Sequence, residues 1–176
     1  MQVYLHWSWL VVALIEINMR SRQYGSYVWN ALEYLALFAI VLMHEFGHAL
    51  ACRQVGGKAE QIILWPLGGV AYVAPPPRPG ATLWSIAAGP LVNVILLPIT
   101  WGIYFWVQSG AIAASPDLRQ YVLAVATINV VLLVFNMLPI YPLDGGQIFR
   151  ALLWFVLGRA ASLAVTAVVG LSEWPA

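Results

Sequence analysis

Three apolar runs of membrane-spanning length dominate the sequence and limit what the chain can fold into. They cover about residues 28–52, 83–107 and 121–138. The hydrocarbon core of a bilayer is about 30 Å thick and needs roughly 20 consecutive apolar residues in a helix. Charged residues make up only 9% of the chain, whereas a soluble domain carries about 25%. We therefore expect an integral, multi-pass membrane protein and exclude a soluble one.

Shorter apolar segments bring the expected number of membrane helices to about five or six, within a single domain over residues 1–176. The run at residues 3–17 is just long enough to cross, and weaker segments follow residue 147. Residues 62–73 are too short to cross as a helix, and a proline and a glycine pair interrupt them. This pattern predicts a hairpin or re-entrant loop. The expected fold class is all-α and polytopic, with a short re-entrant β-hairpin-like segment.

The basic residues predict an orientation in the membrane. With a cytoplasmic N-terminus, five of them lie inside and three outside, which the positive-inside rule favours. The inside group is Arg53, Lys58, Arg78, Arg150 and Arg159, and the outside group is Arg20, Arg22 and Arg119. A net charge of +1 gives no sign of a nucleic-acid partner. No cleavable signal peptide is expected, because no basic region precedes the first apolar run.

Two histidines and a glutamate lie inside the apolar run at residues 28–52. His44 and His48 are four residues apart, so on a helix both imidazoles project from one face and can bind one zinc ion. Glu45 can take a proton from zinc-bound water and pass it to a leaving amine. These groups lie roughly 7–14 Å from the end of the run at Arg53, where ionisable residues are costly and usually functional. The motif predicts a zinc-dependent hydrolase; ordinary polar residues on a helix surface are the alternative.

A catalytic zinc needs a third protein ligand and one open position. Asp144 stands out among the remaining candidates, because Pro139 and Pro142 open the preceding helix, and opened backbone at membrane depth lines a cavity or is buried in protein. The apolar runs at residues 28–52 and 121–138 are expected to cross in the same direction, which brings Asp144 and Glu45 to one side. An N-cap role for Asp144 is the alternative and is compatible with metal binding. The other candidates are His6, Glu16, Glu33, Glu60, Asp117 and Glu173.

Taken together, these motifs resemble the site-2 protease family of intramembrane zinc metalloproteases. The resemblance covers about residues 4–170. It implies His44, His48 and Asp144 as the ligands of one Zn²⁺ and Glu45 as the general base. It also implies a membrane-spanning or membrane-tethered protein substrate. The orientation expected from the basic residues places the active site toward the cytoplasm, in an inner or plasma membrane. The matching segments, in the family's order, are His44–His48, Pro66–Val70, Ala88–Asn93 and Asn136–Gly146.

The resemblance also draws attention to Asn93 and to the hairpin. The Asn93 amide is expected to donate to a developing oxyanion or to position the substrate backbone; an interhelical hydrogen bond is an equal alternative. An exposed strand edge of the hairpin is expected to pair with an unwound substrate.

The end of the sequence departs from the family pattern. Family members continue into a further membrane helix after the equivalent of Gly158-Arg159, so a short or truncated member is expected here. Two other functions stay open: an inactive metal-binding scaffold, and a small ion transporter that uses intramembrane His and Asp. An inactive scaffold needs metal ligands but no base, so the presence of Glu45 argues against it. An ion transporter does not account for the motifs Gly-Pro-x-x-Asn and Asp-Gly-Gly. The sequence does not predict the oligomeric state.

Overall fold

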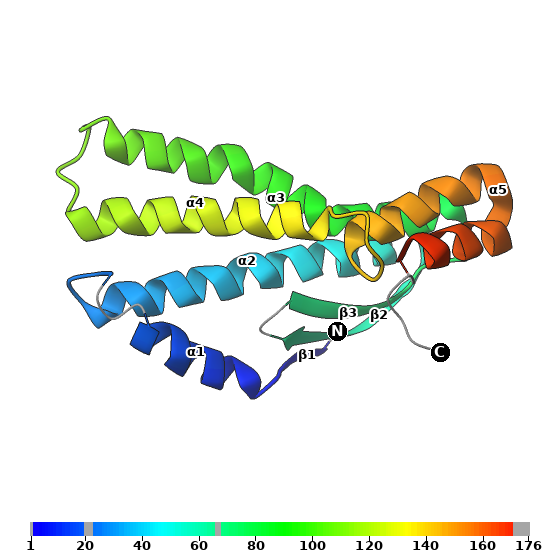
Figure 1. Ribbon diagram of the computed structural model, residues 1–176, viewed down its shortest axis with the longest axis horizontal. Coiled ribbons are helices and arrows are strands. Elements are labelled where there is room, and N and C mark those ends of the chain that lie inside the picture. Colours follow the sequence, from blue (N-terminus) through cyan, green and yellow to red (C-terminus); the bar gives the residue numbers. More distant parts are fainter. Residues whose placement is uncertain (1, 20–22, 66–67, 171–176) are drawn as a thin grey trace.

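The computed structural model describes residues 2–19, 23–65 and 68–170, which form five helices and three strands. The helices extend along one long axis, and the small sheet lies beside the C-terminal half of α2 (Figure 1). The elements in chain order are β1 (Gln2–Leu5), α1 (Ser8–Met19), α2 (Tyr27–Gln54), β2 (Lys58–Trp65), β3 (Gly68–Ala74), α3 (Pro79–Gln108), α4 (Pro116–Asn136) and α5 (Asp144–Gly170).

Helices α2, α3 and α4 form the body of the molecule. Within the described part of the chain, these three are long and apolar enough to cross a membrane. Ser26 and Ser115 cap the starts of α2 and α4 by accepting hydrogen bonds from backbone N–H groups. The backbone N–H of Gly25 donates to Asp117 Oδ1 at 3.1 Å, so α2 and α4 begin at the same end. They therefore run in the same direction, as the sequence predicts.

A small three-stranded sheet includes the predicted hairpin. Strands β2 and β3 pair in antiparallel register from Lys58↔Ala74 to Trp65↔Gly68, and the tip at residues 66–67 lies outside the described residues. The prediction for the hairpin is therefore confirmed for its two strands. Strand β1 adds to β2 in parallel, from Gln2↔Gln61 to Leu5↔Leu64, so the order is β1-β2-β3.

The apolar run at residues 3–17 corrects the expected helix count. It does not form one crossing helix: its start is strand β1, and the rest is α1, which has only 12 residues and is about 18 Å long. Helix α5 has 27 residues but contains a break at Gly158, where φ is 78°. Three helices of the described residues meet the length and composition for a span, fewer than the five or six predicted.

The buried core lies where the sheet and α1 pack on α2. Its members are Trp9, Val41, Ala49, Cys52, Ala59, Ile62 and Leu64. Away from this core, large apolar side chains on α3 and α4 are exposed, which suits contact with lipid. The core therefore fixes the hairpin over the half of α2 that carries His44, Glu45 and His48.

Candidate metal centre

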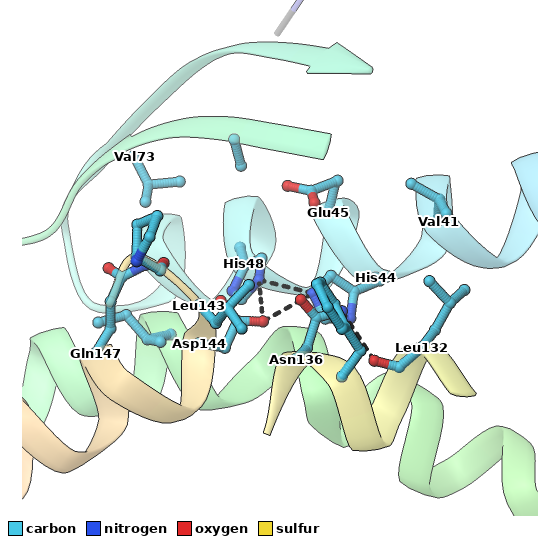
Figure 2. Close-up of a pocket in the computed structure, with 14 residues that line it drawn as sticks. Val41, His44, Glu45, His48, Val73, Leu132, Asn136, Leu143, Asp144 and Gln147 are labelled. Atoms are coloured by element: carbon cyan, nitrogen blue, oxygen red, sulfur yellow. Dashed lines mark hydrogen bonds and ion pairs between the residues drawn. The ribbon is translucent and has the colours of Figure 1, made fainter. Parts of the chain in front are cut away.

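Residues 100 positions apart in the sequence meet in one buried site. Helix α2 presents His44 and His48 on consecutive turns, with Glu45 next to His44, and Asp144, the first residue of α5, faces them (Figure 2). Their exposed fractions are 5%, 5%, 7% and 9%. Helix α4 ends at Asn136, and the turn before Asp144 brings its carboxylate back toward α2.

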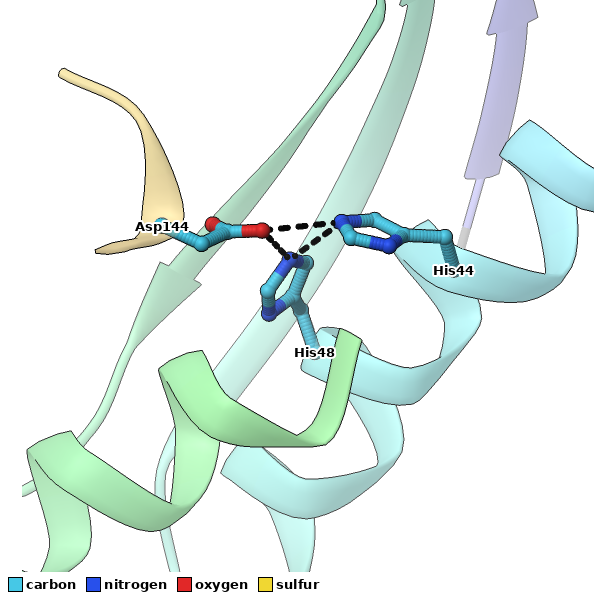
Figure 3. Close-up of side chains that lie close together, drawn as sticks. All are labelled: His44, His48 and Asp144. Carbon is cyan, nitrogen blue, oxygen red and sulfur yellow. Dashed lines mark hydrogen bonds and ion pairs between the residues drawn. The ribbon is translucent and has the colours of Figure 1, made fainter. Parts of the chain in front are cut away.

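Three ligand atoms converge to form a triangle (Figure 3). His44 Nε2 lies 2.9 Å from Asp144 Oδ2 and 3.1 Å from His48 Nε2, and His48 Nε2 lies 3.4 Å from Asp144 Oδ2. A tetrahedral zinc ion with Zn–N and Zn–O bonds of about 2.0–2.1 Å separates its ligand atoms by about 3.3 Å. The triangle therefore fits one zinc ion after small adjustments, and three ligands leave a fourth position open.

The hydrogen bonds behind the two rings show why a cation suits the site. His48 Nδ1 lies 3.0 Å from the backbone oxygen of Ser85, and His44 Nδ1 lies 2.6 Å from Asn93 Oδ1. An oxygen there can only accept, so a neutral ring carries its proton on Nδ1 and has its lone pair on Nε2. Two such lone pairs and a carboxylate then meet at one point. They repel one another unless a cation, either a proton or a metal ion, lies between them.

Glycines leave the space that this arrangement needs. A Cβ at Gly89 would lie 2.2 Å from His48 Nε2 and 2.8 Å from His44 Nε2. A Cβ at Gly47 would lie 2.6 Å from the backbone oxygen of Ala88, so α2 and α3 also approach closely at this level. One at Gly145 would lie 2.4 Å from the backbone oxygen of Met137. The motifs Gly-Pro-x-x-Asn and Asp-Gly-Gly therefore have a steric role in forming the site.

A cavity of about 320 Å³ opens beside the triangle. Glu45 lies on its wall toward the sheet, where Ala71 and Val73 of β3 also line it (Figure 2). Apolar side chains predominate, with two amides among the lining residues. The full lining comprises Val41, His44, Glu45, His48, Ala71, Val73, Ile86, Leu132, Phe135, Asn136, Pro142, Leu143, Asp144 and Gln147. A mostly apolar pocket with a few converging polar groups is typical of a binding or active site.

Asn93 lies behind the site rather than on the cavity wall. It is fully buried on α3, its Oδ1 faces His44, and its Nδ2 donates to Asn129 Oδ1 at 2.9 Å. Its amide thus makes an interhelical hydrogen bond and does not line the cavity. The oxyanion role stays a prediction.

The other candidate residues lie elsewhere or outside the described part of the chain. Glu33 is buried near the start of α2, where it accepts a hydrogen bond of 2.5 Å from Tyr24. It precedes His44 by 11 residues, about 16 Å along the helix. Asp117 caps a loop at the same end. Residue 173 and the side chain of Glu16 lie outside the described residues.

The site also includes amides that the sequence analysis did not single out. Asn129, Asn136 and Gln147 lie in or next to it. For Asn129 there was one signal: an amide in the middle of an apolar run is costly in a membrane and usually has a polar partner.

Comparison with known proteins gives a consistent result. The chain matches the family model of peptidase family M50 over residues 33–111 and 100–172. It is 32% identical, over 96% of its length, to a zinc metalloprotease of Methanocaldococcus jannaschii, of which it spans 47%. It is 33% identical, over 65% of its length, to stage IV sporulation protein FB of Bacillus subtilis, of which it spans 38%. The chain thus spans about half or less of the length of these curated relatives.

A solved structure extends the comparison to the fold. The site-2 protease from Methanocaldococcus jannaschii superimposes with a TM-score of 0.64 at 31% sequence identity. The match covers 97% of this chain and 75% of that one.

Proposed function

Because the chain belongs to peptidase family M50, we propose that it is a zinc metalloprotease that hydrolyses peptide bonds within or beside the bilayer. The observation that carries the proposal is the convergence of His44 Nε2, His48 Nε2 and Asp144 Oδ2 beside a cavity that also contains Glu45. The long apolar helices and the family make the protein an integral, multi-pass membrane protein. A protease whose active site lies among membrane helices acts on polypeptides that are embedded in the membrane or attached to it.

The ligands and the base have separate roles. His44, His48 and Asp144 would hold one zinc ion, which supplies Lewis-acid chemistry by activating water and polarising the scissile carbonyl. Glu45 is adjacent to a ligand but not part of the triangle, so its carboxylate is free to act as the general base. It accepts a proton from the attacking water and passes it to the leaving amine as the C–N bond breaks.

The proposed substrate is a membrane-spanning or membrane-tethered protein in an extended conformation. A helix buries its peptide bonds in its own hydrogen bonds, so the cleaved segment must unwind. Strand β3 supports a way to hold it, because β3 is an edge strand of the sheet and also lines the cavity. An extended segment that paired with β3 would run past Glu45, which is recognition by β-augmentation.

A proline at position 72 tests this pairing, since proline removes a backbone donor from β3. We expect Tyr72→Pro to impair cleavage while zinc content stays at the parent level. Tyr72→Ala is the matched control, because it removes the same side chain and keeps the N–H. Equal cleavage by the two variants would reject pairing along β3.

We also propose that the site lies toward the cytoplasm in an inner or plasma membrane. Arg53 in the last turn of α2, Lys58 at the start of β2 and Arg78 before α3 lie at the end of the bundle nearest the site. Basic residues concentrate on the cytoplasmic side. A cysteine at position 58 should react with an impermeant thiol reagent from the cytoplasmic face alone; labelling from the opposite face would reverse the assignment.

Two substitutions test the enzyme assignment. Glu45→Gln should keep one zinc per chain and lose cleavage of a single-span model substrate in proteoliposomes. Asp144→Ala should lose both zinc and cleavage. If Glu45→Gln cleaved at the parent rate, the base would be wrongly assigned. Metal-dependent ion flux without cleavage would favour a transporter, and zinc binding with neither activity would favour a scaffold.

A further inference from the structure

A chain of amide hydrogen bonds runs from His44 away from the cavity into the space between α3 and α4. His44 Nδ1 meets Asn93 Oδ1 at 2.6 Å, and Asn93 Nδ2 donates to Asn129 Oδ1 at 2.9 Å. Asn129 Nδ2 in turn donates to the backbone oxygen of Asn93 at 3.0 Å. Both asparagines are 0% exposed, and neither lines the cavity. Every polar atom of the two side-chain amides therefore has a partner inside the protein.

The backbone oxygen at the end of this chain determines the direction of every bond in it. A carbonyl oxygen can only accept, so Asn129 must present Nδ2 to it and Oδ1 to Asn93. Asn93 must then present Nδ2 to Asn129, which leaves Oδ1 toward His44. His44 must therefore donate from Nδ1, and the lone pair of the neutral ring is on Nε2, the atom that faces Asp144.

The two ligand histidines differ in how this proton position is secured. His48 meets the backbone oxygen of Ser85 directly, and a backbone carbonyl within a helix cannot exchange for a donor. His44 meets a side-chain amide, which rotation by 180° would convert from an acceptor into a donor. Such a rotation would bring the Asn93 oxygen against Asn129 Oδ1. Asn129 is therefore the group that opposes the rotation.

We propose that Asn129 is a positioning residue for the metal centre. It holds the Asn93 amide so that His44 keeps its proton on Nδ1 and offers Nε2 to the metal. The inference rests on the proposed function in taking zinc as that metal. It gives α4, which supplies none of the three converging ligand atoms, a specific part in building the centre. Partners behind a ligand histidine typically change metal affinity by about 10- to 100-fold when removed.

Zinc affinity of the purified full chain in detergent, measured by chelator competition, tests the proposal without relying on cleavage. We expect Asn129→Leu to weaken zinc binding by about 10- to 100-fold. Asn129→Asp should bind within about threefold of the parent. A protonated aspartic acid in this buried place accepts from Asn93 with one oxygen and donates to the backbone carbonyl with the other.

Thr100→Val is the matched control. Thr100 is also a buried polar residue on α3, but its hydroxyl donates only to the backbone oxygens of Leu96 and Leu97 in its own helix. This variant should keep the parent's zinc affinity. Cobalt substitution adds a second measurement, because the visible absorption of Co²⁺ reports ligand geometry. The Co²⁺ spectrum should change in Asn129→Leu and stay unchanged in Thr100→Val and Asn129→Asp.

The outcomes separate this proposal from the proposed function. If the parent binds no zinc, the proposed function fails. If the parent binds zinc and Asn129→Leu binds it equally well with the same Co²⁺ spectrum, the positioning role alone is wrong. Equal losses of affinity in Asn129→Leu and Asn129→Asp would show that a side chain of the same shape that keeps both hydrogen-bond directions does not preserve zinc binding, which also overturns it. Should Asn129→Leu fail to fold, Asn129→Asp and Asn93→Leu provide the comparison, with Asn93→Leu expected to lose affinity as Asn129→Leu would.

Discussion

Replacing Gly89 by alanine tests whether the absence of a side chain on α3 is what admits the two histidines. The new Cβ would lie 2.2 Å from His48 Nε2 and 2.8 Å from His44 Nε2. Ordinary van der Waals contact begins at 3.4 Å, so the His48 ring would have to retreat by about 1.2 Å. Metal sites accept ligand distances only within about 0.2 Å of their ideal values. We therefore expect His48 to be lost as an effective ligand.

The expected effect is large on the zinc-bound protein and small on the metal-free one. If zinc binding weakens about 100-fold at a zinc concentration 1,000 times the parent's Kd, the stabilisation by zinc falls from about 4.1 to about 1.4 kcal/mol. In the metal-free protein a retreating His48 ring loses its hydrogen bond with the backbone oxygen of Ser85, at a cost of about 0.5–1.5 kcal/mol. Alanine favours a helix over glycine by about 0.5–1 kcal/mol, which offsets this cost. The metal-free variant should therefore differ from the parent in stability by about 1 kcal/mol or less.

Thermal unfolding in detergent with and without zinc, together with chelator competition, measures both quantities. Gly102→Ala is the matched control, because Gly102 is on the same helix and a Cβ there meets nothing within 4 Å. Parent-like zinc affinity in Gly89→Ala would refute the steric argument. An equal loss in Gly102→Ala would show that the effect comes from the helix and not from the site.

Three further substitutions test the loop before α5, the core and the far end of the bundle. Gly145→Ala places a Cβ 2.4 Å from the backbone oxygen of Met137, so metal analysis should find less zinc per chain; full zinc content would contradict this. Trp9→Ala should lower the free energy of unfolding by about 3–5 kcal/mol, since Trp9 is 2% exposed; a loss below about 1 kcal/mol in denaturant titration would count against its place in the core. Tyr24→Phe removes a hydrogen bond to buried Glu33 near the start of α2, so it should lower the free energy of unfolding by about 1–3 kcal/mol and leave zinc affinity unchanged. A change in zinc affinity would show that this end of the bundle is coupled to the metal centre.

The long helices and the hairpin could be predicted because their signals are local. The apolar run at residues 28–52 corresponds to α2 at Tyr27–Gln54, since run length alone decides whether a helix can cross. The glycine pair with β-branched flanks likewise marked β2 and β3. Both signals lie within a few residues of the element that they predict.

The structure of the apolar run at residues 3–17 could not be predicted in this way. Val3 and Tyr4 form β1 because they pair with Ile62 and Ile63, nearly sixty residues later. Strand formation depends on such partners more than on the residues themselves. Run length therefore predicted one helix where the structure has a strand followed by α1.

The metal centre, too, could be predicted where its signals are local and could not be predicted where they depend on helix packing. The spacing of His44 and His48 placed both rings on one helix face, and the opened helix before Asp144 indicated a third candidate. Nothing in the sequence could show that Asn93 and Asn129 face each other, because that pairing depends on how α3 and α4 pack. An amide in a membrane helix indicates that a polar partner exists, but the sequence does not show which residue that partner is.

The parallel pairing of β1 with β2 has a consequence for biosynthesis. Ribosomes add about 5–20 residues per second, so the strand at Gln2–Leu5 waits roughly 3–12 seconds before its partner at Lys58–Trp65 exists. During that time its backbone donors and acceptors have no sheet to join, and α2 is made in between. The sheet over the metal centre can thus form only after the whole of α2 has been synthesised. Early synthesis is therefore the stage at which the N-terminal strand is most open to mispairing or to capture by a chaperone.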